Sequence, residues 1–184
     1  FLLGFLAFIP TTFSYSQQID WLQCFGGTNT EYAYSIKNTF DAGLVFAGST
    51  KSNDGNVSYN HGQTDCWIVK LDYQSDIQWE KSFGGTGTES VYTIQPTKDK
   101  GYIFAGATNS EDGDINGNHG NFDIWVVKID YIGNILWQKC LGGENRENAY
   151  SVAECLDGGY ILAGYTLSDD GDISINHGAE DAWV

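Results

Sequence analysis

The sequence of 184 residues contains no methionine, two prolines and three histidines. Basic side chains are also few: 9 lysines and arginines stand against 24 aspartates and glutamates, for a formal net charge of −15 at pH 7. Nucleic acids and anionic membrane surfaces select the opposite charge balance, so neither is expected as a partner. The 23 glycines are typical of short strands joined by tight turns, and no stretch after residue 17 shows a helical period.

The longest apolar run is at the start of the chain. Residues 1–9 (FLLGFLAFI) are apolar throughout, and Pro10 is followed by small and polar residues. This order is typical of a secretory signal, with Ser14-Tyr15-Ser16 as the cleavage region, and the run is too short to cross a bilayer. We therefore predict a signal-peptide remnant over 1–16 and an exported chain over 17–184 with no membrane span. A buried strand or helix over 1–16 is the alternative.

A repeat of 58 residues organises the rest of the chain. Three features return at this spacing: Trp21, Trp79 and Trp137; Gly26-Gly27, Gly84-Gly85 and Gly142-Gly143; Tyr34, Tyr92 and Tyr150. A fixed period without insertions indicates one supersecondary unit that is copied and stacks on itself. Counted from the first tryptophan, the units are 21–78, 79–136 and 137–184.

Each unit is expected to form four β-strands. In the second unit, residues 90–97, 101–108, 123–130 and 135–143 are short runs rich in β-branched and aromatic residues between turn formers. Four antiparallel strands in a unit of this length describe a propeller blade. We predict an all-β fold with β-propeller-type blades, of which about three are present in an incomplete array, and a β-solenoid is the alternative.

The four cysteines do not form a disulfide pattern. Cys24 and Cys140 share a repeat position, whereas Cys66 and Cys155 occupy two others. Cysteines scattered over unrelated positions are interpreted as small, mostly buried side chains, and they do not suggest a metal site.

A polar loop in each unit carries the residues with the most potential for chemistry. The stretches DGNVSYNHG, DGDINGNHG and DGDISINHG begin at residues 54, 112 and 170, and an aspartate follows each at the start of the next strand. Calcium takes about six to eight oxygen ligands, and carboxylates two residues apart on a turn can share one ion. The candidate calcium ligands are Asp54, Asn56, Asp65, Asp112, Asp114, Asp123, Asp170, Asp172 and Asp181, with Asn60, Asn118 and Asn176 beside them.

Structural roles are the alternative for the repeated residues. The loop residues would then cap turns, with the histidine rings bonded to loop carbonyls and Asp123 anchoring its strand. The glycine pairs lack the helix and lysine of a phosphate loop, so positive φ angles at the strand exits are expected. Trp67, Trp125 and Trp183 are expected in the core and Trp21, Trp79 and Trp137 between blades, with stacking on sugars as the functional alternative for the latter three.

The repeat resembles a known group of proteins. Its pattern S-x-D-G-D…N-H-G…D-x-W-V-V-K…W-x-K-x-x-G-G is similar, from about Trp21 onward, to the repeat of large secreted proteins of Gram-negative bacteria that resemble type IX secretion cargo. The order of strands looks like the kelch type of blade. The resemblance implies a location outside the cytoplasm, and some such proteins carry polysaccharide-degradation labels.

These observations predict a non-catalytic, secreted or cell-surface module for binding or structure, with an unknown protein or glycan ligand. No catalytic residue is assigned, because the histidines and most acids repeat with the unit whereas a catalytic centre is needed once per domain. The alternative is a carbohydrate-active enzyme of glycoside-hydrolase type, or an accessory glycan-binding domain. A glycosidase would need two facing carboxylates about 5–10 Å apart. Calcium is the only cofactor that the sequence suggests.

Overall fold

The computed structural model describes residues 22–184. The predicted signal-peptide remnant over 1–16 and Trp21 lie outside these residues. The described part is all-β, with eleven strands and no helix, so it contains no helix long and apolar enough to cross a membrane.

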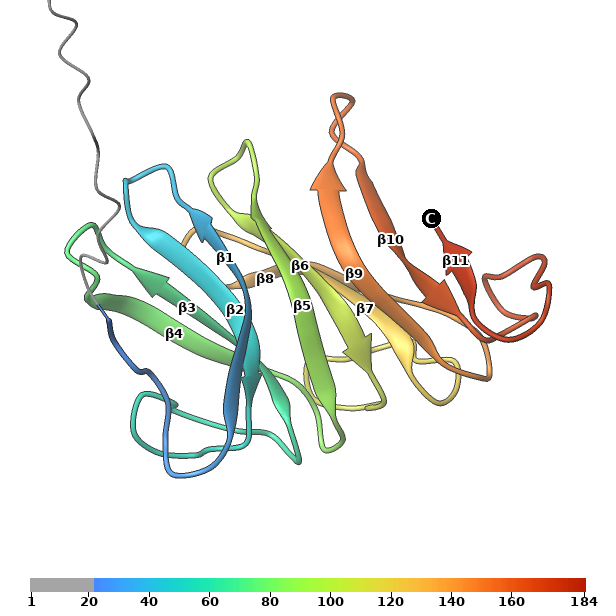
Figure 1. Ribbon diagram of the computed structural model, residues 1–184, viewed down its shortest axis with the longest axis horizontal. Helices are drawn as coiled ribbons and strands as arrows, with labels where there is room; N and C mark the ends of the chain where they lie inside the picture. Colours follow the sequence, from blue (N-terminus) through green and yellow to red (C-terminus); the bar gives the residue numbers. More distant parts are fainter. Residues whose placement is uncertain (1–21) are drawn as a thin grey trace, which may run out of the picture.

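The strands form three antiparallel sheets, and in each sheet neighbouring strands follow one another along the chain. Sheet 1 contains β1 (Glu31–Asn38), β2 (Leu44–Thr50), β3 (Asp65–Leu71) and β4 (Ile77–Phe83). Sheet 2 contains β5 (Glu89–Pro96), β6 (Tyr102–Thr108), β7 (Asp123–Ile129) and β8 (Ile135–Leu141). Sheet 3 contains β9 (Glu147–Glu154), β10 (Tyr160–Thr166) and the short β11 (Asp181–Trp183). Figure 1 shows the three sheets standing side by side in chain order.

The repeat predicted from the sequence is present in the sheets. Their first residues are Glu31, Glu89 and Glu147, and the strands of sheet 2 lie within two residues of the predicted ranges. The all-β class is confirmed. Hydrogen bonding groups each tryptophan strand (β4, β8) with the three strands before it, so the sheets begin one strand later than the units counted from tryptophan.

The core lies between the sheets. One face of sheet 1, with Val45 and Ile68, packs on Phe104 and Trp125 of sheet 2, and the opposite face of sheet 2 packs on sheet 3. Since sheet 2 is covered on both sides, every residue of β6 and β7 is buried. This explains why IWVV is apolar at successive positions and does not alternate.

The five tryptophans within residues 22–184 occupy the two environments expected of them. Trp67 and Trp125 are 1% exposed in the core, and Trp183 is partly buried against sheet 2. Trp79 packs between sheets: its ring contacts Tyr102, and its Nε1 donates a 3.2 Å hydrogen bond to the carbonyl of Tyr131. The ring of Trp137 contacts Tyr160 of sheet 3 and is 39% exposed.

All four cysteines are free. Cys66 and Cys140 are buried and Cys155 is partly buried, whereas Cys24 is exposed. Burial raises the pKa of the Cys140 thiol to about 12, so this thiol stays protonated near neutral pH.

In sheet 1 and in sheet 2, a buried lysine of the third strand holds the turn between the first two strands of the same sheet. Lys128 is 2% exposed, and its Nζ donates to Asp99 Oδ1 at 3.0 Å and to the carbonyl of Ile129 at 3.2 Å. The hydrogen bond from Lys128 and a second one from Thr97 lower the pKa of Asp99 from 3.8 to about 2. Lys70 and Asp41 form the same pair in sheet 1.

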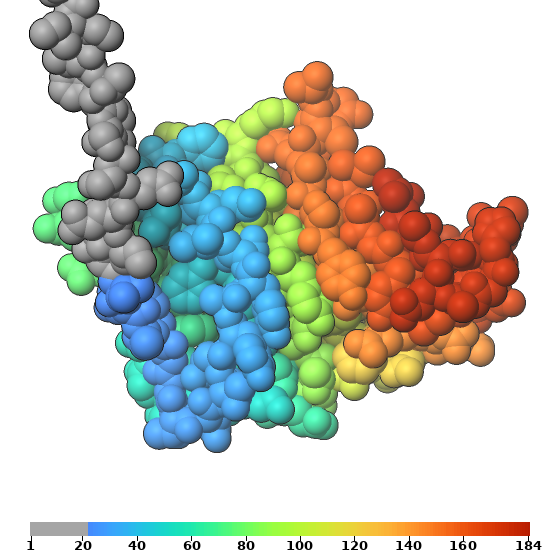
Figure 2. Space-filling view, in the orientation of Figure 1, coloured from blue at the N-terminus to red at the C-terminus, as the bar shows by residue number. Residues whose placement is uncertain are grey.

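The sheets converge along their first strands. β5 contacts both β1 and β9, and Ile94 N donates to Ser35 Oγ at 3.3 Å across the first pair. In Figure 1 the first strands β1, β5 and β9 follow one another in chain order, and Figure 2 shows the sheets packed in order from blue to red. The edges of three sheets therefore form one continuous surface.

Candidate functional site

The polar loop of sheet 2 is fastened to the connection between sheets 1 and 2. Asp112 Oδ1 accepts a 2.8 Å hydrogen bond from Thr86 N, and Asp114 Oδ2 accepts one of 3.1 Å from Gly84 N. The carbonyl of Gly84 in turn accepts from Asp114 N at 3.0 Å. Both predicted ligands thus cap backbone amides in this loop.

The same contacts recur in the other two units. Asp54 Oδ1 accepts from Thr28 N at 2.8 Å, and Asn56 Oδ1 accepts from Gly26 N at 3.1 Å. In sheet 3 the corresponding acceptors are Asp170 Oδ1, which receives Glu144 N at 3.0 Å, and Asp172 Oδ2, which receives Gly142 N at 3.2 Å. Side-chain capping of this kind is the structural alternative raised from the sequence.

Each loop asparagine closes a tight turn before its histidine. Asn118 Nδ2 donates to the carbonyl of Ser110 at 3.1 Å, and its Oδ1 accepts from Gly120 N at 3.0 Å. Asn60 and Asn176 have equivalent contacts with Gly62 and Gly178. The turn brings the histidine over the first residue of the next strand.

The histidine rings bond to carboxylates and not to loop carbonyls, which corrects the sequence-based expectation. His119 Nδ1 lies 2.6 Å from Asp123 Oδ2, and His119 N donates to the same oxygen at 3.0 Å. His61 pairs with Asp65 and His177 with Asp181 in the same manner. A spacing of four residues across a tight turn produced this contact, which periodicity alone does not reveal.

The aspartates of these pairs are buried where a following sheet covers them. Asp65 and Asp123 are 0% exposed, and burial raises the pKa of both carboxyls against the hydrogen bonds from His61 and His119 that lower it. Asp65 Oδ1 and Asp123 Oδ1 have no hydrogen-bond partner among the described residues. At Asp181, hydrogen bonds from His177 lower the pKa instead.

The predicted calcium ligands lie in the polar loops and at the first residues of β3, β7 and β11. Within residues 22–184 there is no group of three or more histidine, cysteine, aspartate or glutamate side chains placed to hold a metal ion. Asp114 lies close enough to Asp65 of the neighbouring sheet to raise the pKa of that carboxyl, so the loop acids approach across the junction between sheets. Calcium binding by these loops stays a prediction.

The glycine pairs serve close packing. Among the described pairs only Gly26 has a positive φ, of 152°, so the expectation of positive φ is wrong for the others. A β-carbon on Gly84 would lie 2.5 Å from Glu89 Oε2 and 2.8 Å from Asp65 Oδ1, and one on Gly85 would lie 2.5 Å from Asp112 Oδ1. Glycine is required because carboxylates from both sheets press on the backbone here.

A row of tyrosine rings along the converging edges was not predicted from the sequence. Tyr34 of β1, Tyr92 of β5 and Tyr150 of β9 follow one another with ring centroids 5.3 Å apart at both steps. Tyr32 extends the row at one end, 5.8 Å from Tyr34, and Tyr165 extends it at the other, 6.0 Å from Tyr150. We call these five residues the tyrosine row.

A β-bulge aims each central tyrosine of the row. The register between the first two strands shifts across Tyr34, Tyr92 and Tyr150, leaving each as the extra, unpaired residue after one that pairs with a glycine. A β-carbon on Gly106 would lie 1.8 Å from the carbonyl oxygen of Ser90, so only glycine allows the bulge. An isolated glycine within the strand GYIFAGAT, repeated every 58 residues, is the sequence signal that could have revealed it.

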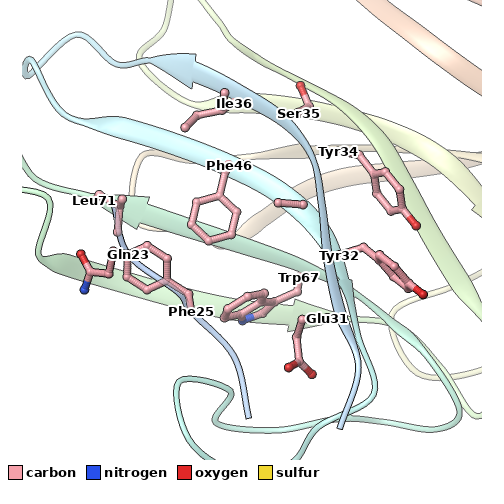
Figure 3. Close-up of a pocket in the computed structure, with 11 residues that line it drawn as sticks. Gln23, Phe25, Glu31, Tyr32, Tyr34, Ser35, Ile36, Phe46, Trp67 and Leu71 are labelled. Carbon is pink, nitrogen blue, oxygen red and sulfur yellow. The ribbon is translucent and has the colours of Figure 1, made fainter. Parts of the chain in front are cut away.

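The row is open to solvent at three of its five tyrosines, whereas Tyr92 and Tyr165 are half-buried. The exposed fractions of Tyr32, Tyr34 and Tyr150 are 56%, 47% and 55%. Figure 3 shows Tyr32 and Tyr34 pointing from β1 to the side away from Phe46 and Trp67, so these tyrosines do not belong to the apolar face of sheet 1. Partial burial and the neighbouring phenols Tyr92 and Tyr32 raise the pKa of Tyr34, which keeps it a neutral hydrogen-bond donor.

Fold and site together define an all-β repeat protein of stacked antiparallel sheets, with a row of partly exposed tyrosines along the shared edge. No protein-family model matches the chain, and no curated protein matches it either.

Proposed function

We propose that the chain is part of a β-propeller that serves as a non-catalytic binding or structural module, secreted or on the cell surface. The observation that carries the proposal is that the outer face of sheet 1 repeats the covered face of sheet 2. Phe46 and Trp67 meet edge to face at 5.6 Å and 82°, as Phe104 and Trp125 do at 5.8 Å and 83°.

The aromatic cover of this outer face also repeats. Phe83, at the end of β4, packs on Phe104 with centroids 5.4 Å apart, and Phe25 packs on Phe46 at 5.6 Å. Phe25 thus stands where the last strand of a preceding sheet would end. Beside it is a pocket of about 360 Å³ lined by Phe25, Phe46, Trp67 and Leu71 (Figure 3).

The opposite end of the array offers the complementary face. Ile161, Ala163 and Ala182 of sheet 3 are exposed, whereas their counterparts Val45, Ala47 and Cys66 in sheet 1 are buried against sheet 2. In the described part of the chain no sheet covers either end face. Two complementary apolar faces support further blades that would cover both of them by closing a ring, as in a propeller of about 4–8 blades.

Export and relatives complete the proposal. The apolar run over 1–9 supports a signal peptide, and the DGD…NHG pattern supports kinship with type IX secretion cargo and a kelch-like blade. The histidines bond to structural aspartates and the loop acids to backbone amides, which supports a binding or structural role over catalysis.

Sedimentation of the 184-residue chain tests the propeller. We expect association that grows with concentration, because each end face is apolar and complementary to the other. Ile161→Lys places a charge on the end face of sheet 3 and should shift the chain toward the monomer. Ile175→Lys is the matched control, since Ile175 is 71% exposed in a loop outside that face. A monodisperse, compact wild-type monomer with a cooperative melt would contradict the proposal.

A further inference from the structure

The tyrosine rings contact one another across the three sheets, but these contacts do not require Tyr34 and Tyr150 to be exposed as they are. In each unit a bulge and a glycine place one tyrosine at the shared edge. The residue before that tyrosine is buried in the core, as Val91 is before Tyr92. Bulges that re-aim a side chain are common beside functional sites. The repetition in three units indicates that the row itself is what the bulges maintain.

We propose that the tyrosine row binds an uncharged polysaccharide chain laid across the edges of consecutive sheets. This assignment rests on the proposed function as a binding module and names its ligand. It requires a ligand whose own units repeat, because the receptor presents the same side chain at even intervals.

The chemistry of the row fits sugar rings. A phenol offers an apolar ring for the C–H face of a pyranose and a hydroxyl for its hydroxyls, so one residue type supplies both kinds of contact. The five rings follow one another with centroids 5.3–6.0 Å apart and angles of 24–62° between neighbouring ring planes, and three of them are exposed.

Charge decides between classes of polysaccharide. The chain has a formal net charge of −15, which repels polyanions such as uronates and sulfated glycans. A neutral glucan or mannan suffers no such repulsion. A folded protein partner lacks a repeating unit to match the row, and a proline-rich peptide, which is repetitive and binds aromatic grooves, is the competing ligand in the test.

Affinity electrophoresis in native gels tests the proposal with the 184-residue chain. The probes are hydroxyethylcellulose, laminarin and galactomannan as neutral polysaccharides, with polygalacturonate and poly-L-proline as competitors. We expect retardation by at least one neutral polysaccharide, and a dissociation constant about tenfold weaker in Tyr92→Ala and in Tyr150→Ala. Tyr92→Phe keeps the ring and should lose less affinity than Tyr92→Ala.

Tyr73→Ala is the matched control, since Tyr73 is 73% exposed in the turn between β3 and β4, away from the row. It should bind like the wild type. Tyr150 is more than half exposed, so its alanine variant should keep the wild-type melting temperature and stays informative if Tyr92→Ala unfolds.

Three results would overturn the assignment: no retardation by any neutral probe, equal retardation of wild type and the Tyr150→Ala variant, or row-dependent binding of poly-L-proline or polygalacturonate. None of these three results affects the sedimentation test of the propeller. Loss of polysaccharide binding with intact, Ile161-dependent association would leave the propeller standing and reject only the ligand.

Discussion

Replacing Gly106 by alanine is expected to lower the stability of the chain sharply. The new β-carbon would lie 1.8 Å from the carbonyl oxygen of Ser90 and 2.8 Å from the α-carbon of Val91. Both are backbone atoms, so no side chain can rotate away, and β6 must move from β5 at the bulge. Overpacking typically costs about 1–3 kcal/mol, and we expect the upper end, about 3 kcal/mol, because backbone has to shift.

Thermal unfolding followed by circular dichroism measures this cost. In a domain of this size about 3 kcal/mol corresponds to a fall in Tm of roughly 6–12 °C. Gly117→Ala is the control: Gly117 has a φ of +89° and no atom within 4 Å of its β-carbon position, so only backbone strain of about 1–2 kcal/mol is introduced. A fall in Tm for Gly106→Ala that is no larger than for Gly117→Ala would refute the reasoning about the bulge.

Three further outcomes follow from the described contacts. Trp125→Ala should lower the free energy of unfolding in urea by about 3–5 kcal/mol. Trp183 has the same repeat position but is only partly buried, so Trp183→Ala should lower this free energy by clearly less. Equal losses would contradict the packing of sheet 2 between its neighbours. Asp112→Ala removes the acceptor for Thr86 N and should cost about 1 kcal/mol equally in calcium and in a chelator, whereas a loss confined to calcium would support the metal prediction. Lys128→Met should raise the pKa of Asp99 from about 2 toward 3.8, as measured by NMR of the carboxyl group. The stability that this pair adds is present above about pH 4 and is lost as the pH falls from 3.8 toward 2. An unchanged pKa of Asp99 in the variant would exclude the pair as the cause of the low value.

The sequence predicts the strands well because their signals are local. β-Branched and aromatic runs between turn formers place β5 to β8 within two residues, and the period extends the prediction to every unit. The burial of Trp67 and Trp125 follows from the same runs. The grouping of the strands into sheets is harder to predict, because the period alone does not say whether a tryptophan strand begins or ends a sheet.

The site could be predicted only in part, because its contacts cross between elements. Capping by the loop acids was expected as an alternative, but their partners Thr86 and Gly84 belong to the connection between two sheets. Simple alternation along β5 assigns Tyr92 to one face or the other, and the bulge places it at neither. The tyrosine row joins residues of different units, so the sequence of a single unit does not predict it.

The near-identity of the junctions between sheets has a consequence for how the chain folds. A face of sheet 1 that fits sheet 2 also resembles the face that sheet 2 offers to sheet 3, so a unit can dock on a wrong neighbour and loop out the one between. Small differences at the junctions, such as Cys66 in sheet 1 where sheet 2 has Ile124, give each pairing its own fit. We expect refolding from denaturant to be slowed by such misdocked species, whereas synthesis from the N-terminus presents the units one at a time and in the right order.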